Sequence, residues 1–321
     1  MEGSYCLHCM SPMDGAICPA CGQAAGSLAP LGHHLAPGTV LESRYLVGRA
    51  IGEGGFGITY IGLDLHLEMK VAIKEYYPVD QITRVDGVTT RVASLAEGQE
   101  ESFARGRRKF LAEALIMARL SKARTVVSVR DFFETNGTAY IVMEFVDGVT
   151  LGDLVEREGP IAPARLLPTL EPLFEVLSAM HENGLIHRDI SPDNIMLEDG
   201  AVRLLDFGCA READAGSKTL TVIMKHGYAP VEQYWRKGQG PWTDIYALSA
   251  TIYFCLTGIV PPRALDRMME DTVQPPSALG VALPPTQERA LLKGLRIQPR
   301  RRFHTMQEMH EALYAVPQED V

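Results

Sequence analysis

Acidic and amide side chains that can act on a phosphoryl group occur in two short strings in the middle of the chain. The first reads HRDISPDN at 187–194, and DFG follows at 206–208. Asp189 is placed to accept the proton of an attacking hydroxyl, and Asn194 and Asp206 can hold the magnesium ion that bridges the phosphates of ATP. Either string alone is weak evidence, and the case for phosphoryl transfer depends on both strings occurring in this order.

A glycine-rich string that can approach phosphate lies upstream. Residues 51–60 read IGEGGFGITY, in which Gly52, Gly54 and Gly57 have G-x-G-x-x-G spacing. Glycine lets backbone N–H groups come close to phosphate because no Cβ intervenes. A plain hairpin turn would explain the string equally well by itself. A dinucleotide-binding fold would place a helix directly after the glycines, whereas the strand-like ITYIGLD follows here and VAIK comes at 71–74.

Together these strings resemble the motifs of protein kinases. The resemblance implies that Lys74, the last residue of VAIK, pairs with the α- and β-phosphates of ATP. It also implies an acidic partner for this lysine on a nearby helix. Apolar residues at helical spacing predict an amphipathic helix over 107–120, and Glu113 lies beside its apolar stripe. Glu100 and Glu101, slightly upstream, are the alternative partners.

The same resemblance assigns residues to adenine. TAYIVMEFVDG at 138–148 reads as a buried strand that runs into a turn, and it matches the kinase segment that faces the base. Ordinary core packing would also explain these apolar residues, so the assignment depends on the family. The implied contacts are Ala72, Met143 as the gatekeeper, the backbone from Glu144 to Val146, and Met196 from the other side.

A cysteine cluster opens the chain. Four of the six cysteines form two C-x-x-C pairs, Cys6 with Cys9 and Cys18 with Cys21. Two such pairs can present four thiolates tetrahedrally to one zinc ion, and the string resembles a short zinc ribbon. Disulfides or unpaired thiols are the alternatives, but a reducing cytosol disfavours disulfides and so short a segment has no core of its own. We expect structural Zn²⁺ here and a role in contact with a protein partner or in regulation.

The resemblance predicts an α+β, two-lobed protein-kinase fold with a β-rich N-lobe and an α-rich C-lobe. It covers about residues 44–315, and the strings IKEYYP, RDISPDN and GYAP-x-EQY are similar to those of a subset of bacterial Ser/Thr kinases. The expected divisions are a zinc ribbon at 1–22, a linker at 23–40, the N-lobe at 41–146 and the C-lobe at 147–316.

Size and composition bound the function. The chain has 321 residues, enough for one two-lobed catalytic unit and a small appendage, and 46% of them are hydrophobic. A net charge of −9 argues against nucleic-acid binding. The most apolar run, at 245–260 after Asp244, is shorter than the roughly 20 residues that span a bilayer, and we expect it to form a buried helix. Because no signal peptide is visible either, we expect a soluble, cytoplasmic protein. The resemblance to protein kinases implies that its substrate is a protein.

Two segments carry no kinase motif. Residues 23–40 are rich in Ala, Gly, Pro and Leu, which is typical of a linker. The His33-His34 pair within it either binds metal or is simply solvated. The stretch 75–106 is longer than a minimal kinase needs and is either an ordered insertion or a mobile loop.

One position departs from the usual kinase pattern. The residue two places after the catalytic aspartate is normally a lysine that contacts the γ-phosphate, and here it is Ser191. When KHGYAPVEQY at 225–234 is aligned without gaps on the family's activation segment, Lys225 falls on a threonine whose hydroxyl normally touches that lysine. We therefore expect Lys225 to restore the missing charge. The alternative is a solvent-facing Lys225 in a nucleotide-binding pseudokinase that serves as a regulatory scaffold.

The alignment yields two further expectations for the C-lobe. Arg302 should pair with Glu232, although Arg300 and Arg301 are its neighbours. A phosphate on the activation loop could pair with Arg188 and order the loop, and a loop already held open is the alternative. The candidate acceptors are Ser217, Thr219 and Thr221.

Overall fold

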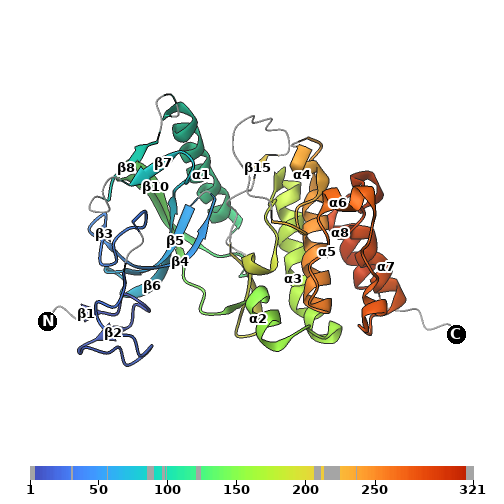
Figure 1. The fold of residues 1–321 in the computed structure, drawn as a ribbon, viewed down its shortest axis with the longest axis horizontal. Helices are drawn as coiled ribbons and strands as arrows, with labels where there is room; N and C mark the ends of the chain where they lie inside the picture. The colour runs from blue at the N-terminus through green and yellow to red at the C-terminus, as the bar shows by residue number, and fades with distance from the viewer. Residues whose placement is uncertain are drawn as a thin grey trace. The chain divides into compact units, whose positions relative to one another are not determined.

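The computed structural model of the protein describes residues 4–29, 32–55, 57–84, 90–95, 98, 100–120, 124–205, 211–212, 225–235 and 237–315. The chain divides into two compact units. The N-terminal unit is built mainly from Met1–Arg119 and Ser128–Val146, and the C-terminal unit mainly from Asp147–Leu220 and Met224–Val321. Strands dominate the first unit and helices the second (Figure 1).

The N-terminal unit contains a six-stranded antiparallel sheet in the order β3-β4-β5-β6-β10-β9. Its strands are β3 (Val40–Leu41), β4 (Tyr45–Gly54), β5 (Gly57–Asp64), β6 (Met69–Tyr76), β9 (Val129–Thr135) and β10 (Thr138–Glu144). Successive side chains of a strand point to opposite faces. Strand β6 therefore carries Ala72 and Lys74 on one face and Val71, Ile73 and Glu75 on the other.

Helix α1 (Glu100–Leu120) packs on the face of the sheet that carries Lys74. Tyr76, on the same face, packs against Phe103 and Phe110 of this helix, with ring centroids 5.4 and 5.5 Å apart. Aromatic pairs at such distances are favourable beyond the area that they bury. The helix begins at Glu100 and not at residue 107 as predicted. It packs on the face of the sheet that carries Lys74, as an acidic partner on this helix requires.

The opposite face of the sheet is covered by parts of 23–40 and 75–106. Leu35 is 1% exposed and belongs to the core cluster of this face. A hairpin of β7 (Ile82–Arg84) and β8 (Val92–Ser94) adds further buried residues to the same cluster. The described part of 75–106 is therefore an ordered insertion. In the second half of the predicted linker 23–40, Leu35 is thus buried in the core of the sheet.

A buried polar network fastens both segments to the sheet. Nη2 of Arg84 donates to both carboxylate oxygens of Glu75 at 2.7 Å, and the two side chains are 1% and 0% exposed. The hydroxyls of Tyr60 and Tyr140 donate to the same carboxylate at 3.0 and 2.8 Å. Loss of one partner of a buried ion pair costs about 3–5 kcal/mol, so we expect this network to hold the insertion in one place.

The N-terminal residues form a small motif that is docked on the sheet. Its hairpin consists of β1 (Ser4–Tyr5) and β2 (Pro12–Met13). The N–H of Arg49, on β4, donates to the carbonyl of Leu7 at 2.9 Å, and Nε of Arg49 donates to the carbonyl of His8 at 3.0 Å. These bonds tie the cysteine-bearing turn to β4.

Apolar contacts complete the docking. Met10 is 2% exposed and packs in one cluster with Ile61 and Leu63 of β5. At Gly48, on β4, an added Cβ would collide with the side chain of Met10 and the carbonyl of Leu7. Glycine at this position therefore allows the close approach of the N-terminal motif.

The C-terminal unit is built around α5 (Pro241–Thr257). Every residue of this helix from Thr243 to Tyr253 is buried, as expected for a helix that is apolar on all sides. Gly258 ends it in the left-handed conformation, with φ of 72°. The predicted buried helix is thus confirmed. The other α-helices are α2 (Leu151–Glu158), α3 (Pro163–Glu182), α4 (Val231–Trp235), α6 (Ala264–Met269), α7 (Pro285–Gly294) and α8 (Met306–Leu313).

Short strands bracket the HRDISPDN string. Strand β12 (Leu185–Ile186) directly precedes it, and the 3₁₀ turn η2 (Pro192–Asn194) ends it. Strand β13 (Ile195–Glu198) follows at once and pairs with β11 (Val149–Thr150) and β14 (Ala201–Leu204). Over the described ranges, no helix is long and apolar enough to cross a bilayer.

Candidate functional site

The glycine-rich string spans the end of β4 and the start of β5, and Gly54 pairs with Gly57 across the two strands. A Cβ on Gly52 or Gly54 would meet nothing within 4 Å, so the backbone at these positions is open to a ligand. A Cβ on Gly57 would collide with the carbonyl oxygen of Glu75 on β6. Gly52 and Gly54 therefore fit the predicted approach to phosphate, whereas Gly57 is required by the packing of β5 on β6.

Lys74 and Glu113 lie on facing surfaces of β6 and α1, and they are only 8% and 9% exposed. Tyr76 lies two positions after Lys74 on β6, and therefore on the same face, and it packs on Phe110 of α1. Glu113 lies one helical turn after Phe110, on the same side of the helix. The two alternative glutamates lie in the first turn of α1 and are exposed. Burial and position therefore favour Glu113 as the partner of Lys74.

The residues predicted to face adenine lie along β6 and β10 and just beyond. Met143 pairs directly with Ala72 across the two strands, and both side chains are buried. The N–H of Glu144 donates to the carbonyl of Ser128 at 3.0 Å. Val146 is buried and is the last residue of the N-terminal unit on this segment. The buried strand that leads to Val146 is the one predicted at 138–148 for the segment that faces adenine.

In the C-terminal unit, Asn194 holds the carboxylate of Asp189. Nδ2 of Asn194 donates to Oδ2 of Asp189 at 2.8 Å and to the carbonyl of the same residue at 2.7 Å. Because Nδ2 makes both bonds, the amide oxygen is the atom of Asn194 that can coordinate a cation. Mg²⁺ prefers oxygen ligands, so the arrangement fits a metal-binding Asn194 beside a proton-accepting Asp189.

The second predicted magnesium ligand, Asp206, lies outside the described residues, as do the three candidate phosphate acceptors. The residue before it is described: the N–H of Leu205 donates to the carbonyl of Asn194 at 3.0 Å. Leu205, the last described residue before the DFG string, therefore lies beside Asn194. Met196, predicted to contact adenine, lies on β13 opposite Arg203.

Asp244 fixes the backbone that leads to Asp189. The N–H groups of His187 and Arg188 each donate to its carboxylate at 2.8 Å, and Nε2 of His181 lies 2.8 Å from the same carboxylate. Asp244 is fully buried. Burial raises its pKa, but these hydrogen bonds outweigh the burial and hold the pKa of Asp244 below its usual value.

From the sequence, Asp244 was noted before the apolar run and as a match to the protein-kinase architecture, but this contact with the backbone was missed. The contact matters because Arg188 has φ of 69°, a left-handed conformation that non-glycine residues adopt only when their surroundings hold them in it. The available signal was an acidic residue at the head of an otherwise apolar helix.

Gln233 is a second positioning residue that sequence reasoning missed. Its Nε2 donates to the carbonyl of Arg188 at 2.8 Å, and the residue is 5% exposed. The loop is thus held through both the N–H and the carbonyl of Arg188. The signal was the polar residue inside the EQY string, which the alignment used only for its glutamate.

Lys225 and Ser191 are in direct contact. Nζ of Lys225 donates to Oγ of Ser191 at 2.7 Å, and Ser191 is fully buried. Nζ also lies 3.3 Å from a carboxylate oxygen of Asp193. The ammonium group therefore lies against the loop that carries Asp189, which is the placement that an exchange of serine and lysine requires.

The predicted pair between Arg302 and Glu232 is confirmed. Nη1 and Nη2 of Arg302 donate to the two carboxylate oxygens of Glu232 at 2.6 and 3.2 Å. The side chains are 0% and 2% exposed, whereas Arg300 and Arg301 are exposed. The fork geometry of arginine matches a carboxylate in this way, so the structure selects Arg302 among the three neighbours.

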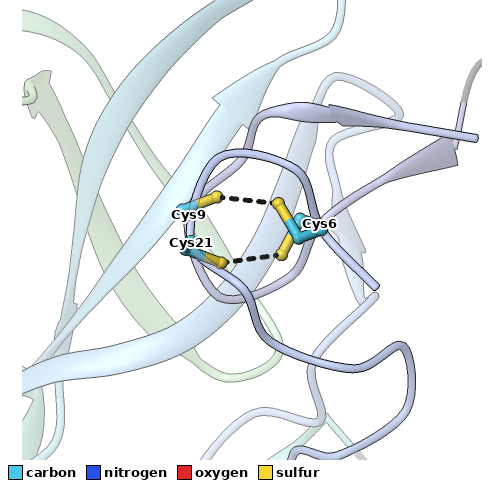
Figure 2. Close-up of side chains that lie close together, drawn as sticks. Cys6, Cys9 and Cys21 are labelled. Atoms are coloured by element: carbon cyan, nitrogen blue, oxygen red, sulfur yellow. Dashed lines mark hydrogen bonds between the residues drawn. The ribbon is translucent and has the colours of Figure 1, made fainter. Parts of the chain in front are cut away.

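The four N-terminal thiols converge on one point. Sγ of Cys6 lies 3.6 Å from Sγ of Cys21, and Sγ of Cys9 lies 3.6 Å from Sγ of Cys18. Ligands about 2.3 Å from one tetrahedral zinc ion lie about 3.8 Å apart, so the spacing fits Zn²⁺. None of the four is in a disulfide. Figure 2 shows the thiols of Cys6, Cys9 and Cys21 pointing toward one another.

At least one of these thiols is readily ionised. Burial raises the pKa of Cys9, but hydrogen bonds from Ser11 and from the neighbouring thiols outweigh burial and lower the pKa to about 6. The hydrogen bonds among the thiols raise the pKa of Cys21 instead, so the cluster shares its negative charge unequally. Zinc binds the thiolate form of cysteine, so the local environment suits a metal ligand.

Comparison with known proteins defines the class of the chain. The family described as protein kinase domain matches residues 45–290. A solved structure, the apo form of PpkA-294, matches with a TM-score of 0.75 and 37% identity, over 88% of this chain and 99% of that one. The chain therefore belongs to the protein kinase family and has the predicted two-lobed kinase fold.

The related sequences are bacterial kinases. Serine/threonine-protein kinase PknB of Mycobacterium tuberculosis is 35% identical over 292 residues, which is 86% of this chain and 43% of that protein. PknB of Mycolicibacterium smegmatis matches to the same extent. PknL of M. tuberculosis is 35% identical over 225 residues, 69% of this chain and 51% of the relative. The chain thus spans about half the length of these relatives or less.

Proposed function

We propose that the chain transfers the γ-phosphate of ATP to Ser or Thr hydroxyls of protein substrates. The observation that carries this proposal is the carboxylate of Asp189, held by Asn194 in a loop whose backbone is fixed by Asp244. The preference for Ser and Thr over Tyr rests on the relatives, which are named serine/threonine-protein kinases.

In this proposal Asp189 orients the substrate hydroxyl and accepts its proton as the hydroxyl oxygen attacks the γ-phosphorus. The bond from the γ-phosphorus to the bridging oxygen breaks, and ADP leaves. Asn194 and Asp206 hold Mg²⁺, which when bound neutralises charge on the phosphates. Lys74, oriented by Glu113, pairs with the α- and β-phosphates.

We assign the remaining nucleotide contacts to residues with suitable placement. The open backbone at Gly52 and Gly54 supports their approach to phosphate, with Gly57 shaping the hairpin. The shared face of Ala72 and Met143 supports a contact with the purine. The full proposed set for adenine is Ala72, Met143, Glu144 to Val146 and Met196.

Lys225 supplies the positive charge that Ser191 lacks. A fixed charge stabilises developing negative charge wherever it reaches the right place, whichever segment carries it. The 2.7 Å bond from Nζ of Lys225 to Ser191 supports this role. The four cysteines, in turn, bind a structural Zn²⁺ in a motif that offers a surface to a protein partner.

The test of the function is phosphate transfer from labelled ATP with Mg²⁺ to a mixed Ser/Thr peptide library. Asp189→Asn should lower turnover by about 10²–10⁴-fold, because the proton acceptor is lost, while ATP still raises the melting temperature. Asp199→Asn, an equivalent change at an exposed turn, is the matched control and should retain full turnover.

The pseudokinase alternative predicts that Asp189→Asn leaves phosphate transfer unchanged. A scaffold would bind ATP, but the wild type would transfer no more phosphate than Asp189→Asn. The relatives give this alternative no support, because each carries a kinase name.

A further inference from the structure

Two adjacent histidines converge on one carboxylate of the glycine-rich strand. Nε2 of His33 lies 2.9 Å from Oε1 of Glu53, and Nε2 of His34 lies 3.1 Å from Oε2. The rings of the two histidines are in edge-to-face contact, with centroids 4.5 Å apart. One ligand atom from each of the three residues fits within a span of 4.8 Å.

Hydrogen bonds hold the backbone of the histidine pair to buried residues. The carbonyl of His33 accepts a bond at 3.1 Å from Nε of Arg84, whose side chain is 1% exposed. The next residue but one, Leu35, is 1% exposed, and its N–H donates to the hydroxyl of Tyr60 at 3.0 Å. Both ends of the pair are therefore anchored in the core, so ordering the side chains around a ligand costs little entropy.

The donor set is that of a transition-metal site. Two imidazole nitrogens and one carboxylate, with a position left for water, form a common zinc site. Nitrogen and oxygen ligands about 2.0–2.2 Å from one tetrahedral ion lie about 3.3–3.5 Å apart, so the 2.9 and 3.1 Å distances to Glu53 need to lengthen by only a few tenths of an ångström to admit an ion. The side chains of His33, His34 and Glu53 are 37%, 11% and 38% exposed, so an ion has access from solvent.

We propose that His33, His34 and Glu53 form a second metal site, which binds Zn²⁺ or a similar divalent transition-metal ion and is separate from the four-cysteine site. Imidazole ligands favour such ions over Mg²⁺. The ion would join the histidine pair to β4, the strand that carries Gly52 and Gly54. Because Glu53 lies between Gly52 and Gly54, metal binding would restrain this end of β4.

The test is the zinc content of the full-length chain, measured by elemental analysis after dialysis against low micromolar ZnSO₄. We expect two zinc ions per wild-type chain and one in the double variant His33→Gln/His34→Gln. Glutamine can still donate a hydrogen bond to Glu53 but is a poor zinc ligand, so this variant separates metal binding from hydrogen bonding. Glu53→Gln should also lose one equivalent.

Two controls distinguish metal bound at the histidine site from metal bound at the four-cysteine site. His66→Ala/His304→Ala removes two exposed histidines elsewhere and should retain both ions. A titration with Co²⁺ distinguishes the ligands, because only thiolates give intense charge-transfer absorption. The His33→Gln/His34→Gln variant should keep that absorption and bind one cobalt fewer.

Two results would overturn the proposal. One is a wild-type chain that holds a single zinc ion with thiolate absorption alone. The other is a glutamine variant with the same metal content as the wild type. In either case His33 and His34 serve only as hydrogen-bond partners of Glu53. The readout is metal content, so it is independent of whether the chain transfers phosphate.

Discussion

The stabilisation that a charged side chain gives to a transition state depends on where the charge lies and not on which segment of the chain carries it. Ser191 takes the position at which kinases usually have lysine, and Lys225, 34 residues further on, brings its ammonium group to 2.7 Å from the serine hydroxyl. The hydroxyl and the ammonium are both still present, on exchanged segments. This contact is the main reason to read the departure as an exchange rather than a loss.

We expect Lys225→Ala to lower kcat by about 10²–10³-fold, the usual effect of removing one group that stabilises transition-state charge. The KM for ATP should change little, because the proposed contact of Lys74 with the nucleotide is kept. The double variant Ser191→Lys/Lys225→Thr, which restores the common arrangement, should recover at least about tenfold over Lys225→Ala.

Steady-state kinetics checks this, with Lys237→Ala as the control for an exposed lysine. A Lys225→Ala enzyme with wild-type kcat would rule out the exchange. So would a double variant no faster than Lys225→Ala.

At the scale of elements, buried ion pairs and hydrogen bonds position the segments around the catalytic loop. Asp244 of α5 holds the loop through two N–H groups, and Gln233 of α4 holds it through a carbonyl. Arg302 in turn holds α4 through Glu232, and its guanidinium also donates to the carbonyl of Trp242 at 2.9 Å. The loop geometry therefore depends on residues far outside its own string.

Arg302→Ala should destabilise the C-terminal unit by about 3–5 kcal/mol, because it leaves the buried Glu232 without its partner. Arg301→Ala, a deletion of the exposed neighbour, should stay within about 0.5 kcal/mol. Urea unfolding followed by tryptophan fluorescence measures both, since the two tryptophans, Trp235 and Trp242, lie in this unit. Equal unfolding midpoints for the two variants would contradict the prediction.

At the scale of the whole molecule, the N-terminal motif is part of the N-terminal unit and not a tethered appendage. Backbone bonds to Arg49 and the burial of Met10 against β5 hold it on the sheet. The segment that follows reaches Glu53 and the core of the same sheet. A partner that binds the motif would therefore act directly on the sheet that carries the glycine-rich strand.

Gly48→Ala should detach the motif without touching its cysteines, because the new Cβ collides with Met10 and the carbonyl of Leu7. Hydrogen exchange measured by mass spectrometry should become faster over residues 4–22, while the four-cysteine site keeps its zinc. Gly15→Ala, where a Cβ meets nothing within 4 Å, is the matched control. Unchanged exchange in Gly48→Ala would show that the contact is dispensable.

Much of the fold and of the candidate site was accessible from sequence because the strings are local. HRDISPDN places Asp189 and Asn194 five residues apart, close enough for one loop to bring them together. The register of β6 puts Lys74 and Ala72 on one face through the period of a strand alone. The burial of Leu35 was not predicted, since a short Ala-, Gly- and Pro-rich segment carries no periodic pattern to reveal which residue is buried.

The amino-acid sequence by itself identified the kinase family and predicted the phosphoryl-transfer residues and the four-cysteine cluster, because each of these is a set of residue types at short, regular spacing. Only the tertiary structure decided that Lys225 meets Ser191, that Asp244 holds the backbone of Arg188, and that His33 and His34 meet Glu53. These partners are far apart along the chain, and their contact depends on how buried surfaces of strands and helices pack, which no local spacing records.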